Sequence, residues 1–318
     1  MHILIQELDL ESDKMGENKV QSFRNKYESQ IKEFRYTLHL LRKSPLALAG
    51  LVLLMLIFLV AIFAPYLAIE HPKYIRGQQT WSSDYAEVLK PPSWEHPFGT
   101  DDMGHDIYSM VVYGSREALY VGFIVVLVTT FIGVLLGAYS GYVGGWFDEI
   151  IMRICDIFFS IPSLILAMAI TAALGPGLEH VMYALIFTWW PAYTRIVRGQ
   201  VLSVKQNQYI EAARAVGVGR FKIIWKHVIP NSLPPILVQA TMDLGNVILA
   251  AAGLAFLGLG GAPYTADWGV MVSQGRSWIL AGKWWWSTFP GLAIFITVLA
   301  FNLFGDGLRD ILDPRLRR

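Results

Sequence analysis

The sequence predicts an all-α integral membrane protein with six transmembrane helices. Of its 318 residues, 54% are hydrophobic and 16% are charged, whereas soluble domains carry about 25% charged residues. The run from residue 44 to residue 69 contains no charged side chain and exceeds the roughly 20 residues that a helix needs to cross a bilayer. Further apolar runs follow along the chain, so we expect several spans. The net charge of +1 gives no electrostatic basis for a nucleic-acid partner.

Six apolar runs are predicted to cross the membrane, and local breakers mark their irregularities. The "GPG" at 175–177 ends the third run, because glycine and proline interrupt helices. The "WWP" at 189–191 predicts a kink in the fourth. The polar stretch with Asp243, Gly245 and Asn246 predicts a break midway along the fifth. The predicted spans are residues 46–67, 119–140, 155–174, 180–198, 232–258 and 287–305.

The distribution of lysine and arginine predicts that both termini face the cytoplasm. With six spans and a cytoplasmic N-terminus, 20 of the 26 Lys and Arg residues fall on the cytoplasmic side and 6 fall outside. Cytoplasmic loops generally carry such an excess of positive charge. The expected organisation is a cytoplasmic N-terminal tail (1–45), a first transmembrane helix (46–69), an extracytoplasmic loop (70–117), a five-helix core (118–307) and a cytoplasmic C-terminal tail (308–318).

Two further patterns concern packing and the membrane surface. Gly133, Gly137 and Gly141 recur at every fourth residue of the second span, so they share one helix face and permit close helix packing. We expect this packing within one subunit rather than between subunits.

The segment 264–286 is amphipathic and ends in three tryptophans at 284–286. Because tryptophan favours the membrane–water interface, this segment is expected to lie along the outer surface as an anchor.

The sequence lacks the common signatures of catalysis. It contains no Gly-x-x-x-x-Gly-Lys-Ser/Thr phosphate loop, no His-Glu-x-x-His and no paired-Cys metal pattern, so no catalytic or metal-binding residue is predicted.

Asp243 and Asn246 are the polar residues expected deep in the membrane, where such groups are costly and often functional. Several interpretations stay open for Asp243: it lines a transport pathway, it pairs with a neighbouring helix, or it has a structural capping or pairing role at a break at Gly245 and Asn246. We expect Asp156, Arg195 and Arg198 to snorkel at the cytoplasmic membrane surface.

The stretch "YIEAARAVGVGRFKIIWKHVIPN", residues 209–231, is charged although apolar runs flank it. Its alanines favour a first short helix. Gly217 and Gly219 then allow the chain to turn, because glycine adopts positive φ readily. A second short helix is expected to follow and to end at Pro230, before the fifth span. The sequence therefore predicts two helices joined by a bend, outside the membrane on the cytoplasmic side.

This stretch resembles the EAA motif of ABC-importer permeases. The motif consists of Glu-Ala-Ala, three residues, Gly, nine residues, an apolar residue, one more residue, an apolar residue and Pro. The broad motif has Ile where this chain has His227, and His is usual there in the dipeptide/oligopeptide branch. The stretches "HPFGTDDMGHDIYSMVVYGSREAL" (96–119) and "GDGLRDILDPRLR" (305–317) are similar to the same branch. The residues that the resemblance assigns to ATPase coupling are Glu211, Ala212, Ala213, Gly217, His227 and Pro230.

The resemblance covers about residues 35–318 and implies the type I ABC-importer permease fold, with the segment 209–230 as a cytoplasmic coupling helix. In such importers this helix sits in a groove of a separate ATP-binding subunit. The implied partners are a second homologous permease subunit, two ATP-binding subunits, an extracytoplasmic substrate-binding protein and membrane lipid, with no nucleic acid. The chain itself is expected to bind no cofactor, because ATP and Mg are used by the partner ATPases. The implied location is the prokaryotic plasma membrane.

The function that the resemblance implies is to form half of the pathway for di- or oligopeptides in an ATP-driven importer. Similar permeases carry nickel chelates or oligosaccharides, so these substrates stay open. Two other classes of function also stay open. One is a channel or an ion-coupled secondary transporter that uses Asp243, and the other is a membrane-embedded enzyme or assembly factor. The importer requires partner subunits for uptake, whereas a secondary transporter would work alone.

Overall fold

The computed structural model describes residues 44–75 and 78–312. Most of the two predicted tails, 1–45 and 308–318, lies outside these residues. The chain folds into helices and one short antiparallel hairpin. In chain order the elements are α2 (Pro45–Leu67), β1 (Lys73–Ile75), β2 (Gln78–Thr80), α3 (Ile107–Val143), α4 (Gly145–Phe159), α5 (Ser163–Leu174), α6 (Leu178–Val204), α7 (Gln208–Ala215), α8 (Arg220–Ile223), the π-helical η1 (Ile224–Val228), α9 (Ile229–Leu254), the π-helical η2 (Ala255–Leu259), α10 (Trp268–Gly275), the 3-10 helix η3 (Arg276–Ala281) and α11 (Trp285–Leu312).

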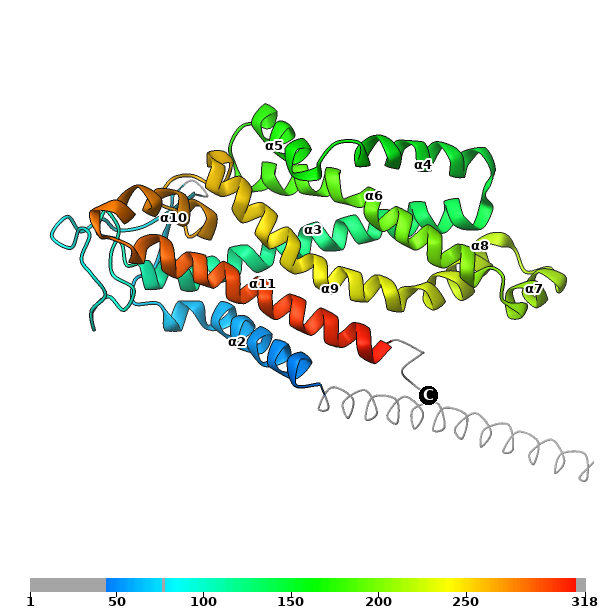
Figure 1. Ribbon diagram of the computed structural model, residues 1–318, viewed down its shortest axis with the longest axis horizontal. Coiled ribbons are helices and arrows are strands. Elements are labelled where there is room, and N and C mark those ends of the chain that lie inside the picture. The colour runs from blue at the N-terminus through cyan, green and yellow to red at the C-terminus, as the bar shows by residue number, and fades with distance from the viewer. Residues whose placement is uncertain (1–43, 76–77, 313–318) are drawn as a thin grey trace, which may run out of the picture.

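The long helices form an elongated bundle (Figure 1). Helices α3 and α6 make the most extensive contact, α9 packs against α3 and α11, and α2 lies beside α11. Helix α7 lies at one end of the bundle, and α10 lies at the other end (Figure 1). The two ends of the bundle are therefore built differently.

The number of membrane-crossing helices agrees only approximately with the predicted six. Within the described residues, four helical segments are long and apolar enough to cross a membrane, and a fifth is obtained if the bent pair α4 and α5 counts as one. The remaining helix of the bundle is α6, which has 27 residues and is about 40 Å long. It is long enough to span the membrane, but it is not among the sufficiently apolar segments. The all-α membrane fold is thus confirmed, with four or five spans established by length and composition.

The third predicted span, 155–174, is wrong as a single straight helix. Helix α4 ends at Phe159 and α5 begins at Ser163, and the two axes differ by 85°. Pro162 explains the break, because a proline disfavours helical backbone in the residue before it and cannot donate a backbone hydrogen bond. Pro162 accordingly has extended backbone, with φ −54° and ψ 123°. The predicted span therefore combines the end of one helix with the whole of the next.

The break predicted in the fifth run also falls elsewhere. Helix α6 contains Pro191, where a kink was predicted, without ending there, and α9 continues through the polar stretch that contains Asp243. Pro230 does not end a helix, since it occupies the first turn of α9, where a missing backbone N–H is tolerated. The interruption occurs instead in η2, where Gly258 has φ 87°. A π-helical segment therefore adjoins α9 at each end, and its middle is regular.

The glycine pattern of α3 packs against α6 of the same chain, as predicted. A methyl group at Gly133 would lie 2.3 Å from Tyr193 Cβ, and one at Gly137 would lie 2.5 Å from the carbonyl oxygen of Thr194. At Gly141 the corresponding distance to the Arg198 carbonyl oxygen would be 3.0 Å. The two backbones therefore approach more closely than any larger residue allows. This contact explains why α3 and α6 form the centre of the bundle.

Two of the three tryptophans at 284–286 are buried and do not lie at a lipid interface. The prediction of an interfacial anchor is therefore wrong for these two. Trp285 and Trp286 are 4% and 1% exposed, whereas Trp284 is 50% exposed. The Trp285 indole donates to the Thr100 carbonyl oxygen at 3.2 Å, and the Trp268 indole donates to the Val111 carbonyl oxygen at 2.9 Å. A buried indole N–H usually finds such an acceptor. These rings fill the core between the loop, α3 and α11.

The predicted loop 70–117 is folded, and its last part is the beginning of α3. Asp106 caps this helix by accepting from the Ser109 backbone amide at 2.8 Å, which satisfies one of the free amides of the first turn. The Ser109 hydroxyl oxygen in turn accepts from the backbone amides of Ile69 and Glu70, each at 2.9 Å. His96 contacts the same cap, with Nδ1 2.9 Å from Asp106 Oδ1. The histidine is therefore part of the loop structure.

Candidate functional site

The charged segment forms an exposed helical elbow, which we define as residues 208–223. Helix α7 ends at Ala215, and Gly217 then has φ 79°. The Gly217 amide donates to the Arg214 carbonyl oxygen and the Val218 amide donates to the Ala213 carbonyl oxygen, each at 3.0 Å. This is a Schellman-type helix end, which requires left-handed backbone at the glycine position. The bend predicted at Gly217 is thus present.

One side of the elbow is anchored in the protein and the other side is exposed. Ile210 is fully buried in an apolar cluster with Val204 and Ile223, and Ala213 packs against the same cluster. The opposite side carries small or charged residues, and Val216 at its end is 79% exposed. Because this face has few bulky side chains, another protein surface can approach its backbone closely. The exposed residues of α7 and the following turn are Gln208, Tyr209, Glu211, Ala212, Arg214, Ala215, Val216 and Gly217.

Basic side chains fix the elbow to the end of α3. The Arg214 Nε donates to the Tyr142 hydroxyl at 3.2 Å, and its guanidinium carbon lies 5.1 Å from the centre of the same ring. Lys205 Nζ donates to the Gly141 carbonyl oxygen at 2.9 Å. Together with Arg220 these groups line a cleft of about 460 Å³. This contact could not be predicted from the sequence, because Tyr142 lies more than sixty residues before the segment.

The structure brings together some of the residues that the resemblance assigned to coupling, and separates others. Glu211, Ala212, Ala213 and Gly217 lie on α7 and the turn that follows it. His227 belongs to η1, where it is half-buried. Pro230 is exposed at the start of α9. The last two residues are thus part of the helix that connects the elbow to the bundle.

Two exposed aromatic side chains extend the elbow surface and were not singled out in the sequence. Phe221 is 73% exposed and Trp225 is 45% exposed, and their ring centres are 5.9 Å apart. Their i, i+4 spacing places them on one helix face, so the spacing was a signal that could have identified them. Exposed aromatic rings of this kind are enriched at protein interfaces.

Asp243 is buried in the bundle, with 6% of its surface exposed. Its Oδ1 accepts from Gln239 Nε2 and from Asn246 Nδ2, each at 3.2 Å. Both donors lie on the same helix, at i−4 and i+3, so the carboxylate pairs within α9. Asn246 itself is exposed. This pairing favours the structural interpretation of Asp243 over a pathway-lining one, and it occurs without the predicted break.

Asp243→Asn is therefore expected to keep the thermal stability of the protein. The amide oxygen can accept the same two hydrogen bonds, and the substitution removes a charge from the interior. Asp243→Leu should lower stability by about 1 kcal/mol or more, because two amide groups lose their acceptor. Thermal unfolding of both variants checks these expectations. An equal loss of stability in the two variants would show that the two hydrogen bonds do not account for the role of this carboxylate.

The other charged residues near the predicted membrane surface are paired, which corrects the expectation that they merely snorkel. Arg198 donates to Asp148 through Nε at 2.6 Å and through Nη2 at 2.7 Å. Arg195 donates to Asp156 through Nη2 alone, also from α6 to α4. The Arg195 guanidinium also lies 4.3 Å from the centre of the Phe159 ring. The two-point pair of Arg198 has defined geometry, and together the two pairs hold α4 along α6.

The apolar bundle and its charged elbow define a multi-pass integral membrane protein. A family model described as "Binding-protein-dependent transport system inner membrane component" matches residues 133–318, which is more than half of the chain. A second, described as "N-terminal TM domain of oligopeptide transport permease C", matches residues 33–92. The chain belongs to the family of inner membrane components of binding-protein-dependent transport systems.

Curated relatives with this architecture are similar over most of their length. A probable D,D-dipeptide transport system permease protein of Escherichia coli K12 is 47% identical over 276 residues, covering 87% of this chain and 90% of the relative. A dipeptide transport system permease protein of Alkalihalophilus pseudofirmus is 43% identical, with 90% and 91% covered. A glutathione transport system permease protein of Pectobacterium atrosepticum is 42% identical, with 87% and 89% covered. The chain is thus similar to permeases throughout, and the family resemblance predicted from the sequence is confirmed.

Proposed function

We propose that this chain is the permease subunit of an ATP-driven importer for di- or oligopeptides, and that it forms half of the translocation pathway. The observation that carries the proposal is the exposed elbow, a charged helical segment anchored to the bundle by Ile210 and Arg214. Such a segment transmits force only if another protein binds it. The membership in a binding-protein-dependent transport family supports the same conclusion.

ATP hydrolysis is assigned to separate subunits. The sequence contains no phosphate-binding loop, so two ATP-binding subunits would supply ATP and Mg chemistry, and this chain would bind no cofactor. The exposed face of α7, with Glu211 and Ala212, is the proposed contact with one of these subunits. Phe221 and Trp225 extend this contact, because they are exposed beside it. A second homologous permease subunit completes the pathway.

The orientation follows from the same assignment. The elbow faces the cytoplasm, where ATP is available, and the end of the bundle with α10 faces the outside, where a substrate-binding protein docks. The predicted excess of Lys and Arg on the elbow side supports this orientation. Both termini are then cytoplasmic. The membrane is the plasma membrane of a prokaryote, as the bacterial relatives suggest.

Peptides are the proposed substrates because of the names of the relatives. These names specify D,D-dipeptides, dipeptides and glutathione, and all three substrates contain amide-linked amino acids. Oligosaccharides and nickel chelates remain as alternative cargo for the same importer class. An ion-coupled transporter that uses Asp243 is disfavoured, because that carboxylate is already paired within α9.

Reconstitution in lipid vesicles tests the proposal. The purified chain alone should take up no radiolabelled dipeptide, with or without an ion gradient. The ATP-binding subunits, the second permease subunit and the binding protein are then added. Uptake should now occur, and it should require ATP on the side of the membrane where the ATP-binding subunits lie. Uptake by the single chain on a proton or sodium gradient would overturn the importer proposal in favour of a secondary transporter.

A further inference from the structure

A cavity of about 850 Å³ opens at the end of the bundle opposite the elbow. It lies between the start of α6, the irregular loop after η2, and α3. Its polar lining includes Glu117, Glu179, Gln79 and Gln274. Pockets that bind small molecules usually have volumes of about 300–1,000 Å³. The cavity is therefore large enough for a dipeptide, and we call it the outer cavity.

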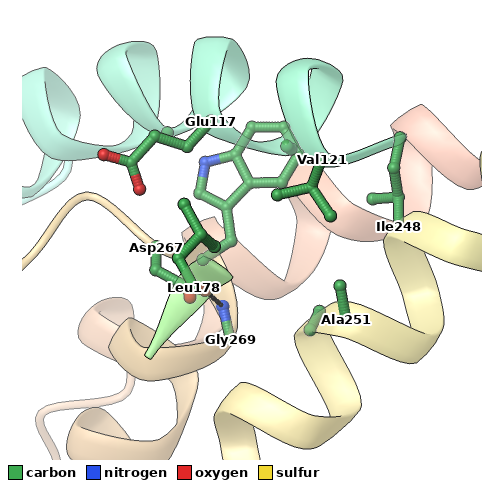
Figure 2. Close-up of a pocket in the computed structure, with 11 residues that line it drawn as sticks. Glu117, Val121, Leu178, Ile248, Ala251, Asp267 and Gly269 are labelled. Atoms are coloured by element: carbon green, nitrogen blue, oxygen red, sulfur yellow. Dashed lines mark hydrogen bonds between the residues drawn. The ribbon is translucent and has the colours of Figure 1, made fainter. Parts of the chain in front are cut away.

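A smaller cavity of about 30 Å³ adjoins the outer cavity on the side of the bundle interior. Both are lined by Glu117 of α3 and Leu178 of α6. Figure 2 shows Glu117 beside Asp267 at the start of α10, with Val121 and Ile248 on the interior side. Glu117 thus marks the boundary between a wide polar space and a narrow apolar one.

The lining of these two cavities is acidic. It contains three carboxylates, Glu117, Glu179 and Asp267, and among the lining residues there is no lysine or arginine. The Asp267 carboxylate is already engaged, because it accepts from the Gly269 amide at 2.8 Å and from the Val270 amide at 3.3 Å. Burial raises the pKa of Asp267, and these two hydrogen bonds oppose the rise.

Glu117 differs from the other two carboxylates of the cavities. Its side chain is half-buried, and among the described residues it has no hydrogen-bond or ion-pair partner. Glu179, in contrast, is exposed to solvent. A carboxylate taken from water without a partner is costly, and a ligand with a positive charge removes that cost. A strong charge-assisted hydrogen bond is therefore available at Glu117 to a cationic donor.

We propose that the outer cavity receives the peptide substrate and that Glu117 binds its free amino terminus. The inference rests on the proposed function, because a peptide importer would receive its substrate at this end of the bundle. An ammonium group has three N–H donors and one positive charge, and the Glu117 carboxylate can both accept a hydrogen bond from it and balance its charge. The amino terminus would sit at the narrow end of the outer cavity, and the remainder of the peptide would occupy the wide polar part. The lining contains no lysine or arginine, and its histidine, His180, lines the outer cavity rather than the narrow one, which disfavours the opposite orientation, with the peptide carboxylate at the narrow end.

The experiment uses the assembled importer in lipid nanodiscs without binding protein, so that only the permease can select the ligand. Binding of Ala-Ala and of N-acetyl-Ala-Ala is compared by saturation-transfer NMR titration. Acetylation removes the positive charge, leaves one N–H donor and adds one small acetyl group. Wild type should bind Ala-Ala at least about tenfold more tightly, since a hydrogen bond to a charged group contributes about 1.5–3 kcal/mol. Glu117→Gln should abolish this preference.

Glu179→Gln is the matched control, because it removes a carboxylate from the same cavity at an exposed position, where water screens its charge. It should keep the preference for Ala-Ala. Glu117→Asp serves as the second variant in case Glu117→Gln does not fold, and it should keep a reduced preference. Equal binding of the two peptides by wild type overturns the inference without any variant. An unchanged preference in folded Glu117→Gln overturns it as well.

The same preparation separates this inference from the proposed function. ATP-dependent dipeptide uptake with binding protein present tests the function, and the preference for Ala-Ala tests the site. Normal uptake with no preference for the free amine means that the site inference alone fails. A preference for the free amine without any dipeptide uptake means that the proposed peptide import fails, while Glu117 still binds an ammonium group.

Discussion

Gly217→Pro is expected to abolish ATP-dependent uptake while the ATPase activity of the assembled importer persists. Gly217 has φ 79°, whereas proline requires φ near −65°. Proline would also remove the amide that donates to the Arg214 carbonyl oxygen. The end of α7 would therefore change direction, and the exposed face would no longer match the subunit that binds it. Parallel measurement of ATP hydrolysis and dipeptide uptake in vesicles reports the uncoupling.

Gly219→Ala is the matched control for this prediction. Gly219 has φ −61°, a value that alanine adopts freely, and a methyl group there would meet nothing within 4 Å. Its uptake should equal that of wild type. Glu211→Lys, which reverses a charge on the exposed face of α7, should uncouple in the same direction as Gly217→Pro. Normal uptake in both Gly217→Pro and Glu211→Lys would show that the elbow is not the coupling contact.

Gly133→Ala is expected to destabilise the protein strongly although the added group is only a methyl. That methyl would lie 2.3 Å from Tyr193 Cβ and 2.9 Å from the Thr194 backbone nitrogen. Neither atom can move without shifting α6, so the contact between α3 and α6 must open. Overpacking of this kind costs about 1–3 kcal/mol, and sometimes more. Thermal unfolding in detergent should show a lower Tm and less folded protein.

Gly199→Ala provides the comparison, because Gly199 is also a glycine inside a bundle helix. A methyl group there would meet nothing within 4 Å, so only the helix propensity changes, and alanine is favoured by about 0.5–1 kcal/mol. Its Tm should stay the same or rise. If Gly133→Ala and Gly199→Ala gave the same Tm, the close approach of α3 and α6 would not limit stability.

The elbow could be predicted from the sequence because its determinants are local. The alanines favour helix, and Gly217 supplies the positive φ that ends it. The apolar runs likewise identified the long helices, since a bilayer requires a minimum length of apolar helix. The break after Phe159 was not predicted, although Pro162 follows closely in the sequence. Its effect depends on whether the neighbouring helices can accommodate a straight continuation, and the sequence does not contain that information.

The environment of individual side chains depended on contacts between distant parts of the chain. Trp285 and Trp286 are in an amphipathic, tryptophan-rich stretch, which predicted an interfacial position. Both are buried, and Trp285 donates to Thr100 in the loop before α3. Arg198 was expected to snorkel, but it pairs with Asp148, which lies fifty residues earlier. In each case the local sequence favoured one environment, but folding brings a partner from a distant part of the chain next to the side chain.

The sequence by itself determined the all-α membrane class, the family resemblance and the bend at Gly217, because each depends on composition or on a short run of residues. Only the tertiary structure decided that the glycines of α3 meet α6 and that Asp243 is paired within an unbroken helix. The same holds for Glu117, an ordinary residue of α3 in the sequence. It becomes a candidate ligand-binding group because α6, α10 and the loop after η2 enclose it without supplying a partner. Burial and pairing are properties of the assembled bundle, and no local pattern encodes them.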